Sequence, residues 1–380
     1  MADNNENKVL NVPLLRFPEF TDEWKESVLS DFVERVKRKN KNNLCKLPLT
    51  ISAQYGLVDQ ISFFNKVIAS ENMSNYYLLH KGDFAYNKSY SSEYPWGAIK
   101  RLDCYEQGTL SSLYICFKPY SHVSSDFLTH YFETSKWHQG ISEIAVEGAR
   151  NHGLLNVGIQ DFFETRHCLP QSLLEQEKIA KFLNLIEERI ATQNKIIEKY
   201  ESLIKGIAQN VARNNKPNIR LSECLECSSS TLQESDVCEN GTYPVYGANG
   251  IVGYLDNYNA EKEAVYIIKD GSGVGTVSYV TGKCSATGTL NTLQAKEGYS
   301  LQYLYYMLKV FNFEPYKTGM AIPHIYFKDY GKAKIFCPSY TEQLKYVGVL
   351  STIDNKLSAE QSILTDLSLQ KQYLLHQMFI

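Results

Sequence analysis

The sequence predicts an α+β protein in which two mixed α/β domains are separated by two long helices. The helices are expected to pair as an antiparallel coiled coil with pseudo-twofold symmetry. Two observations predict this architecture. Residues 174–212 carry apolar residues in alternating steps of three and four, which is typical of a coiled coil. The same pattern returns about 167 residues later, and such a repeat indicates a duplicated unit.

The first long helix is expected because its heptad pattern continues with a single glycine, Gly206, and without proline. The pattern is interrupted at Gln193, and the second run is interrupted at the matching position, Glu360. Lys371 is the one mismatch, because it stands where the first run has Ile204. We expect the two helices to pair through Leu183, Ile186, Ile190, Ile197, Leu350, Ile353, Leu357 and Leu364.

The chain divides into five segments. Residues 1–20 form an arm, which Pro13 and Pro18 keep extended. Residues 168–212 and 337–380 form the segments of the long helices. Each segment opens with a cysteine and a proline, and the helix follows them. Residues 21–167 and 213–336 alternate short β-like runs, such as 61–69, with turns, and each forms one mixed domain. Similar helices beside dissimilar domains indicate one repeated structural role and two different targets.

The composition indicates a globular protein. Hydrophobic residues make up 43% and charged residues 21% of the chain, and the net charge is −3. A dedicated nucleic-acid binder is often basic, so any DNA contact would need a local basic face and a partner. No apolar run is long enough for a membrane span, and the start resembles no signal peptide. Nine scattered cysteines fit reduced thiols, so a cytoplasmic location is expected.

The sequence offers no sign of a catalytic, cofactor or metal site. Gly271, Gly273 and Gly275 precede a β-like run, whereas a dinucleotide fingerprint needs a helix after its glycines. Cys224 and Cys227 have no second pair at zinc spacing. A phosphate-binding loop, a methyltransferase tetrapeptide and a nuclease-like carboxylate cluster are also missing, which favours a non-catalytic subunit.

Two antiparallel helices with matching seams would carry a domain at each end. Duplex DNA has a similar approximate symmetry, and its half-sites are read at fixed separations. The chain could therefore be a two-headed DNA ruler. It could equally be a coiled-coil adaptor that presents two heads to proteins.

Three stretches resemble the specificity subunits of Type I restriction–modification enzymes. The first is the opening, Val12-Pro13-Leu14-Leu15-Arg16-Phe17-Pro18-Glu19-Phe20. The second is the start of each long helix, where a proline precedes Glu175-Gln176 and Glu342-Gln343. The third lies in the second domain, at residues 243–254 and 269–273, and resembles that family's target-recognition domains.

The resemblance implies that each domain reads one half of a split, asymmetric site in double-stranded DNA. It also implies that the helices set the spacing and dock methyltransferase subunits, and that a motor–nuclease subunit joins the complex. S-adenosylmethionine, ATP and magnesium would then bind to the partners, with no cofactor on this chain. A stand-alone methyltransferase with fused recognition domains is a third interpretation, which the missing tetrapeptide opposes.

Candidate DNA-binding residues are basic or amide side chains in loops, because phosphates need cations and base edges need hydrogen-bonding groups. In the first domain we select a basic run, which could also be a solvated helix end, a loop after a strand, and a glycine-flanked loop. These candidates are Lys37, Arg38, Lys39, Lys41, Asn87, Lys88, Ser89, Tyr90, Arg150, Asn151 and His152. Lys100-Arg101 is a further basic pair that could contact DNA, but it could also be a simple hairpin turn.

In the second domain the candidates lie in two loops. One joins two β-like runs and holds Lys269 and Ser272, with glycines at 271 and 273 that allow close backbone approach. The other occupies the position equivalent to the Arg150 loop and holds Lys317, Thr318 and His324. A structural, hydrogen-bonded histidine is the alternative interpretation of His324.

Overall fold

The structure is a computed structural model that describes residues 11–145, 153–271, 273–319 and 322–380. The chain forms two compact units, and each is described by itself. Unit 1 comprises Met1–Ala191 and Thr365–Ile380, and unit 2 comprises Thr192–Leu364. Two long helices, α5 (Leu173–Asn214) and α9 (Tyr340–Gln377), each contribute one part to unit 1 and the other to unit 2. Within the described ranges, every helix is too short or too polar to cross a lipid bilayer.

Unit 1 is built around a four-stranded antiparallel sheet in the order β2-β9-β6-β7. The hairpin β3-β4 and the antiparallel pair β5-β8 form a second lobe with a shared core, and β1 pairs with β10. The strands are β1 (Lys25–Val28), β2 (Val33–Arg35), β3 (Leu49–Ser52), β4 (Gly56–Asp59), β5 (Tyr77–His80), β6 (Phe84–Asn87), β7 (Ala98–Arg101), β8 (Gln107–Leu110), β9 (Ile115–Pro119) and β10 (Arg166–Leu169). The helices are α1 (Gln60–Phe64), α2 (Ser125–Tyr131), α3 (His138–Ile144) and α4 (Ile159–Glu164), with 3-10 turns at Leu29–Asp31 and Lys41–Asn43.

Unit 2 repeats this plan with the four-stranded order β12-β18-β15-β16. A second sheet has the order β14-β13-β17, and β11 pairs with β19. The strands are β11 (Ile219–Arg220), β12 (Leu225–Ser229), β13 (Tyr243–Gly247), β14 (Gly250–Leu255), β15 (Glu263–Ile268), β16 (Val277–Thr281), β17 (Ser285–Ala286), β18 (Leu290–Ala295) and β19 (Lys334–Ile335). The helices are α6 (Leu221–Cys224), α7 (Leu301–Lys309) and α8 (Phe327–Tyr330), with 3-10 turns at Glu234–Asp236 and Glu314–Tyr316.

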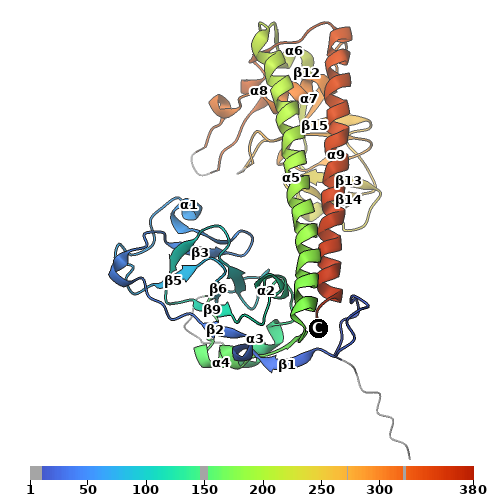
Figure 1. The fold of residues 1–380 in the computed structure, drawn as a ribbon. Coiled ribbons are helices and arrows are strands. Elements are labelled where there is room, and N and C mark those ends of the chain that lie inside the picture. Colours follow the sequence, from blue (N-terminus) through green and yellow to red (C-terminus); the bar gives the residue numbers. More distant parts are fainter. Residues whose placement is uncertain (1–10, 146–152, 272, 320–321) are drawn as a thin grey trace, which may run out of the picture. The chain divides into compact units, whose positions relative to one another are not determined.

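In both units the two long helices pack against the domain core (Figure 1). The core of unit 1 joins Ile179 and Leu183 of α5 to Leu374 and Met378 of α9. The core of unit 2 includes buried residues of both helices, namely Ile197, Ile204, Ala208, Leu350 and Leu357. Positions late in α5 thus share a core with positions early in α9, so the helices pair antiparallel. This confirms the predicted fold class.

The predicted helix-pairing residues differ in burial. Leu183, Ile197, Leu350 and Leu357 are buried, whereas Ile186, Ile190, Ile353 and Leu364 are partly exposed. The mismatch at Lys371 also has a physical reason. Its Nζ lies 2.7 Å from Glu187 Oε1 of α5, so an ion pair replaces an apolar contact at this point of the seam.

The described part of the arm packs on the start of α5 in unit 1. Arg16 donates two hydrogen bonds to the carboxylate of Glu175, at 2.7 and 2.8 Å, and Trp24 Nε1 donates a third at 3.1 Å. Phe17 packs edge-on against Phe182, with ring centroids 6.0 Å apart. The backbone N–H of Leu15 donates to the carbonyl of Gln377, which ties the arm to the end of α9.

Candidate nucleic-acid interface

In unit 2 the two candidate loops lie side by side. Lys269 directly follows β15, and its carbonyl accepts a 3.0 Å hydrogen bond from the backbone N–H of Ile325. The N–H of Gly271 donates to the carbonyl of Pro323 at 3.0 Å, and Asp270 forms a bridge with His324. The loop after β15 is therefore extended as a short ladder with residues 323–325. Ser272 lies outside the described residues.

The second loop of unit 2 is closed by a pair of backbone hydrogen bonds. Thr318 and His324 exchange two backbone hydrogen bonds of 2.9 and 2.8 Å. Gly319 has a φ of +90°, and a Cβ there would stand 2.3 Å from the carbonyl oxygen of Ile322, so only glycine fits. The Nζ of Lys317 lies 2.5 Å from Glu314 Oε1, which offsets part of its charge. Lys269, Thr318 and His324 thus meet at one edge of the unit.

In unit 1 the candidate loop after β6 has the same setting. The side chain of Asn87 accepts a 3.0 Å hydrogen bond from the N–H of Ser89, which turns the chain out of the sheet. The carbonyl of Lys88 accepts from the N–H of Leu155 at 2.9 Å, and the N–H of Tyr90 donates to Gly153 at 3.1 Å. The ladder thus directly follows the loop with Arg150, Asn151 and His152, which lie outside the described residues.

The two loops occupy equivalent places. β6 is the third strand in the order β2-β9-β6-β7, and β15 is the third strand in the order β12-β18-β15-β16. In each unit the chain leaving this strand pairs with a later segment, residues 153–155 or 323–325. Two domains with different sequences therefore present a loop, paired with a later segment, at the equivalent point of their four-stranded sheets. We call this feature the paired loop edge.

The basic run of unit 1 lies elsewhere and is partly used for folding. Arg38 forms an ion pair with the buried Asp83. Lys39 donates to the carbonyl of Asn75 at 2.9 Å and lies 3.7 Å above the ring of Tyr77. Lys37 and Lys41 are exposed. Two of the four cations are therefore committed to the lobe formed by β5 and its neighbours.

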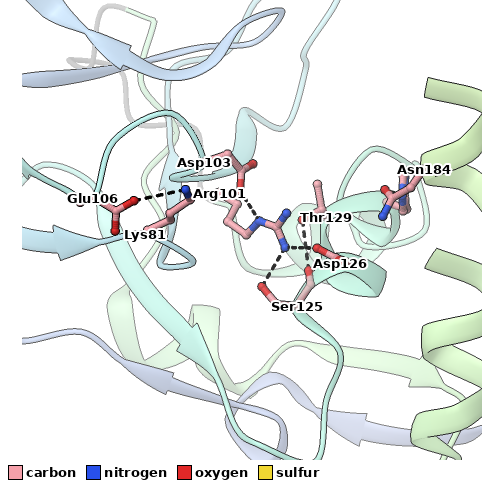
Figure 2. A network of polar contacts seen from close by, with 9 residues as sticks. Lys81, Arg101, Asp103, Glu106, Ser125, Asp126, Thr129 and Asn184 are labelled. Atoms are coloured by element: carbon pink, nitrogen blue, oxygen red, sulfur yellow. Dashed lines mark hydrogen bonds and ion pairs between the residues drawn. The ribbon is translucent and has the colours of Figure 1, made fainter. Parts of the chain in front are cut away.

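A polar network at the end of β7 neutralises another pair of cations. Figure 2 shows Arg101 donating to Asp103 at 2.7 Å, to Ser125 at 3.0 Å and to Asp126 at 2.6 Å. The preceding Lys100 pairs with Glu133 at 2.5 Å. These contacts tie β7 to α2, so Lys100 and Arg101 have a structural role in unit 1.

Sequence reasoning missed Tyr326 and Lys328 beside the loop edge of unit 2. The rings of His324 and Tyr326 lie 5.7 Å apart, and Lys328 Nζ lies 5.2 Å from the Tyr326 ring. Tyr326 is 47% exposed, so its ring is available for stacking. The signal was the alternation of His324, Tyr326 and Lys328 along one short segment.

The thiols of Cys224 and Cys227 are not activated by their surroundings. Burial raises the pKa of Cys224 to about 12 and that of Cys227 to about 11, so both thiols stay protonated. The described residues contain no cluster of three or more side chains that could hold a metal ion. A strand, β16, follows the glycines of residues 271–275, as predicted.

Comparisons with known proteins give one consistent likeness. A family model described as "Type I restriction modification DNA specificity domain" matches residues 217–368. The Type I restriction enzyme EcoprrI specificity subunit of Escherichia coli is 27% identical over 116 residues, 30% of this chain and 29% of that protein. A putative type I specificity subunit of Mycoplasma genitalium is 25% identical over 251 residues, 59% of this chain and 64% of that protein. The matches thus span less than two thirds of these relatives.

The fold is similar over nearly the whole chain to a solved structure. The crystal structure of a Type I restriction–modification system S subunit from M. genitalium superposes with a TM-score of 0.61. The match covers 97% of this chain and 99% of that chain at 17% sequence identity. At this identity the likeness concerns the fold alone.

Proposed function

We propose that the chain, which is similar to the specificity subunits of Type I restriction–modification enzymes, is the sequence-specific DNA-recognition subunit of such a complex. It has no catalytic activity of its own in this proposal. Each domain reads one half of a bipartite, asymmetric site in double-stranded DNA. We assign the two target-recognition domains to residues 21–167 and 213–336.

The paired loop edge is the observation that supports this proposal most. Readout of base edges needs a rigid frame that presents loops with hydrogen-bonding side chains. In each unit the loop follows or adjoins the third strand of the four-stranded sheet. Unit 1 places Lys88 and Ser89 there, and unit 2 places Lys269 and His324 there. Because the loops differ in sequence, they suit two different half-sites.

The partners follow from the proposed role. Methyltransferase subunits would dock on the long helices, and a motor–nuclease subunit would complete the assembly. S-adenosylmethionine, ATP and magnesium would bind to those partners, and the complex would act in the cytoplasm. The long helices would fix the distance between half-sites, because a paired helix is stiff along its axis.

Modification mapping of DNA tests the proposal. The chain is co-expressed with its methyltransferase subunit, and methylated adenines are mapped with and without it. We expect one split motif that depends on this chain. Lys269→Ala with His324→Ala should relax one half of the motif, and Lys88→Ala with Ser89→Ala the other, each at a cost of about 1–3 kcal/mol per lost base contact.

The alternatives give different results in the same experiment. If both pairs of substitutions leave the motif unchanged, the loop edges do not read bases. If no adenine modification depends on this chain, the adaptor interpretation gains. Binding of S-adenosylmethionine by the isolated chain would favour the stand-alone methyltransferase. Arg101→Gln is the matched control, because its contacts are structural and it should leave the motif intact.

A further inference from the structure

The segment from Ile61 to Ile68 in unit 1 exposes a cluster of large apolar side chains. Its sequence predicts a strand, but the structure forms the short helix α1 followed by an irregular turn. Phe63 is 45% exposed, Phe64 43%, Val67 74% and Ile68 50%. Exposed apolar clusters mark interaction surfaces more often than isolated apolar residues do.

Local contacts hold α1 in a defined shape. The side chain of Asp59 caps the helix by accepting from the N–H of Ile61 at 3.0 Å and from the hydroxyl of Ser62 at 2.6 Å. Asn65 ends it in the left-handed region, with a φ of 50°. The rings of Phe63 and Phe64 pack edge to face, 4.9 Å apart. The two rings therefore form a preorganised tip beside β4.

The sequence around this tip is basic. Residues 36–80 contain six lysines and arginines but only two acidic residues, although the chain as a whole carries a net charge of −3. The N–H of Gln60 donates to Pro48, and Asn43 donates to the carbonyl of Glu71. These contacts place residues 41–48 next to the segment that carries α1. Lys41, Lys46 and Lys66 are exposed and make no ion pair within the described part of the chain.

We propose that α1 is an apolar wedge that inserts Phe63 or Phe64 into the DNA while Lys41, Lys46 and Lys66 hold the flanking phosphates. This inference rests on the proposed function and adds a contact that reads DNA deformability. Phenylalanine and other apolar side chains insert between base steps and unstack them. Cations on the same and on adjoining segments suit a phosphate backbone, whereas an apolar protein partner would not need them.

Fluorescent duplexes test the wedge. The full chain in complex with its methyltransferase subunit binds a duplex that carries the mapped motif, with 2-aminopurine placed in turn at each adenine and at single steps around it. We expect one step to brighten as it unstacks. Phe63→Ala with Phe64→Ala should abolish that signal and weaken binding between about fivefold and about 150-fold, the loss expected for one stacked base.

A second set of variants separates stacking from charge. Lys41→Gln, Lys46→Gln and Lys66→Gln together should lower the dependence of affinity on salt by about three counterions. The phenylalanine variant should leave that dependence unchanged. Leu113→Ala is the matched control, because Leu113 is 68% exposed in the same unit but belongs to the turn between β8 and β9 and not to the segment that carries α1. Circular dichroism establishes that each variant is folded.

The outcomes distinguish the wedge from the proposed function. If the wild-type complex binds its motif and the phenylalanine variant binds equally well with the same fluorescence, the wedge is wrong and the recognition role stands. If that variant instead fails to associate with the methyltransferase subunit, α1 is a protein contact and the wedge is also wrong. If the wild-type complex shows no preference for any motif, both proposals fall.

Discussion

His167 shows how single residues in this fold are held in one protonation state. It is buried on β10, where Tyr131 Oη lies 2.8 Å from Nδ1 and Thr165 Oγ1 lies 2.8 Å from Nε2. The Thr165 hydroxyl donates to the carbonyl of Phe162 at 2.8 Å. Nε2 must therefore carry the proton that reaches Thr165, and Nδ1 accepts from Tyr131. The neutral ring is satisfied on both sides.

This arrangement predicts acid sensitivity. Burial lowers the pKa of His167 to about 3, while the unfolded chain keeps the usual value of about 6.5. Between these values the unfolded state binds more protons, so stability falls as the pH is lowered. His167 should contribute a loss of about 2 kcal/mol between pH 7 and pH 5. Urea unfolding across this range, compared with His167→Gln, measures the contribution, and identical pH slopes would contradict it.

Residue-level contacts were the hardest to predict from the sequence. The run from Lys37 to Lys41 was selected for its charge, but a sequence does not show that Asp83 and Tyr77 engage two of its members. Strand and glycine signals in the sequence predicted that Lys269 and His324 lie in loops. The hydrogen bonds that bring the two loops together depend on sheet pairing, which a single sequence does not contain.

At the scale of elements, the two long helices begin in the same way. Gln176 accepts from the N–H of Ser124, which caps α2, and donates to the carbonyl of Pro170 at 2.9 Å. Gln343 accepts from the N–H of Ser300, which caps α7, and donates to Pro338 at 2.9 Å. The glutamine of each Glu-Gln pair thus fastens the start of each long helix to the preceding proline and to the short helix of its own domain.

The neighbouring glutamates differ, and this difference can be measured. Glu175 is buried and accepts three hydrogen bonds, and its hydrogen bond with Arg16 raises the pKa of the guanidinium. Glu342 is exposed and accepts from Ser339 at 3.0 Å. Glu175→Gln should lower the free energy of unfolding by about 2–3 kcal/mol, because it leaves a partly buried arginine without its ion pair.

Glu342→Gln is the matched control, because it changes the equivalent residue of the repeat. An exposed carboxylate contributes little, so its effect should stay within about 0.5 kcal/mol. Chemical denaturation of both variants gives the comparison. Equal effects would mean that the arm does not depend on Glu175 for its attachment to α5.

The elements themselves were predicted with uneven success. The long helices followed from a pattern sustained over several heptads. Residues 61–69 were predicted to be a strand because they are rich in apolar and aromatic side chains, but this was wrong. Asp59 offers a helix cap and Asn65 a left-handed stop, and these local signals outweighed the β propensity of the run. The helix that results is too short to bury its apolar residues.

At the scale of the whole molecule, the repeat meets itself at one point. Gln193 of α5 donates a 2.9 Å hydrogen bond to the carbonyl of Glu360 in α9, and the two side chains also hydrogen-bond. These are the equivalent positions of the two runs, 167 residues apart. In an antiparallel pair of repeated helices, residues that face their own equivalents mark the centre of the pairing. The interruption shared by the two seams in the sequence is this polar centre.

A paired insertion at this centre tests the spacing role of the helices. One heptad is added after Gln193 in α5 and one before Glu360 in α9, which preserves the seam on both sides of the centre. Seven residues lengthen a helix by about 10.5 Å, or about three base pairs of duplex DNA. The unmodified gap of the split motif should therefore grow by about three base pairs in a modification map.

The heptad in α5 alone is the control for this experiment. A single insertion shifts the seam residues of α5 past those of α9, so apolar residues such as Ile197 lose their partners. That variant should modify no site, whereas the paired variant should keep both half-sites and change only the distance between them. If the paired variant methylates the original motif with its original gap, the distance between the half-sites does not depend on the length of α5 and α9. The spacing would then be set outside the helices.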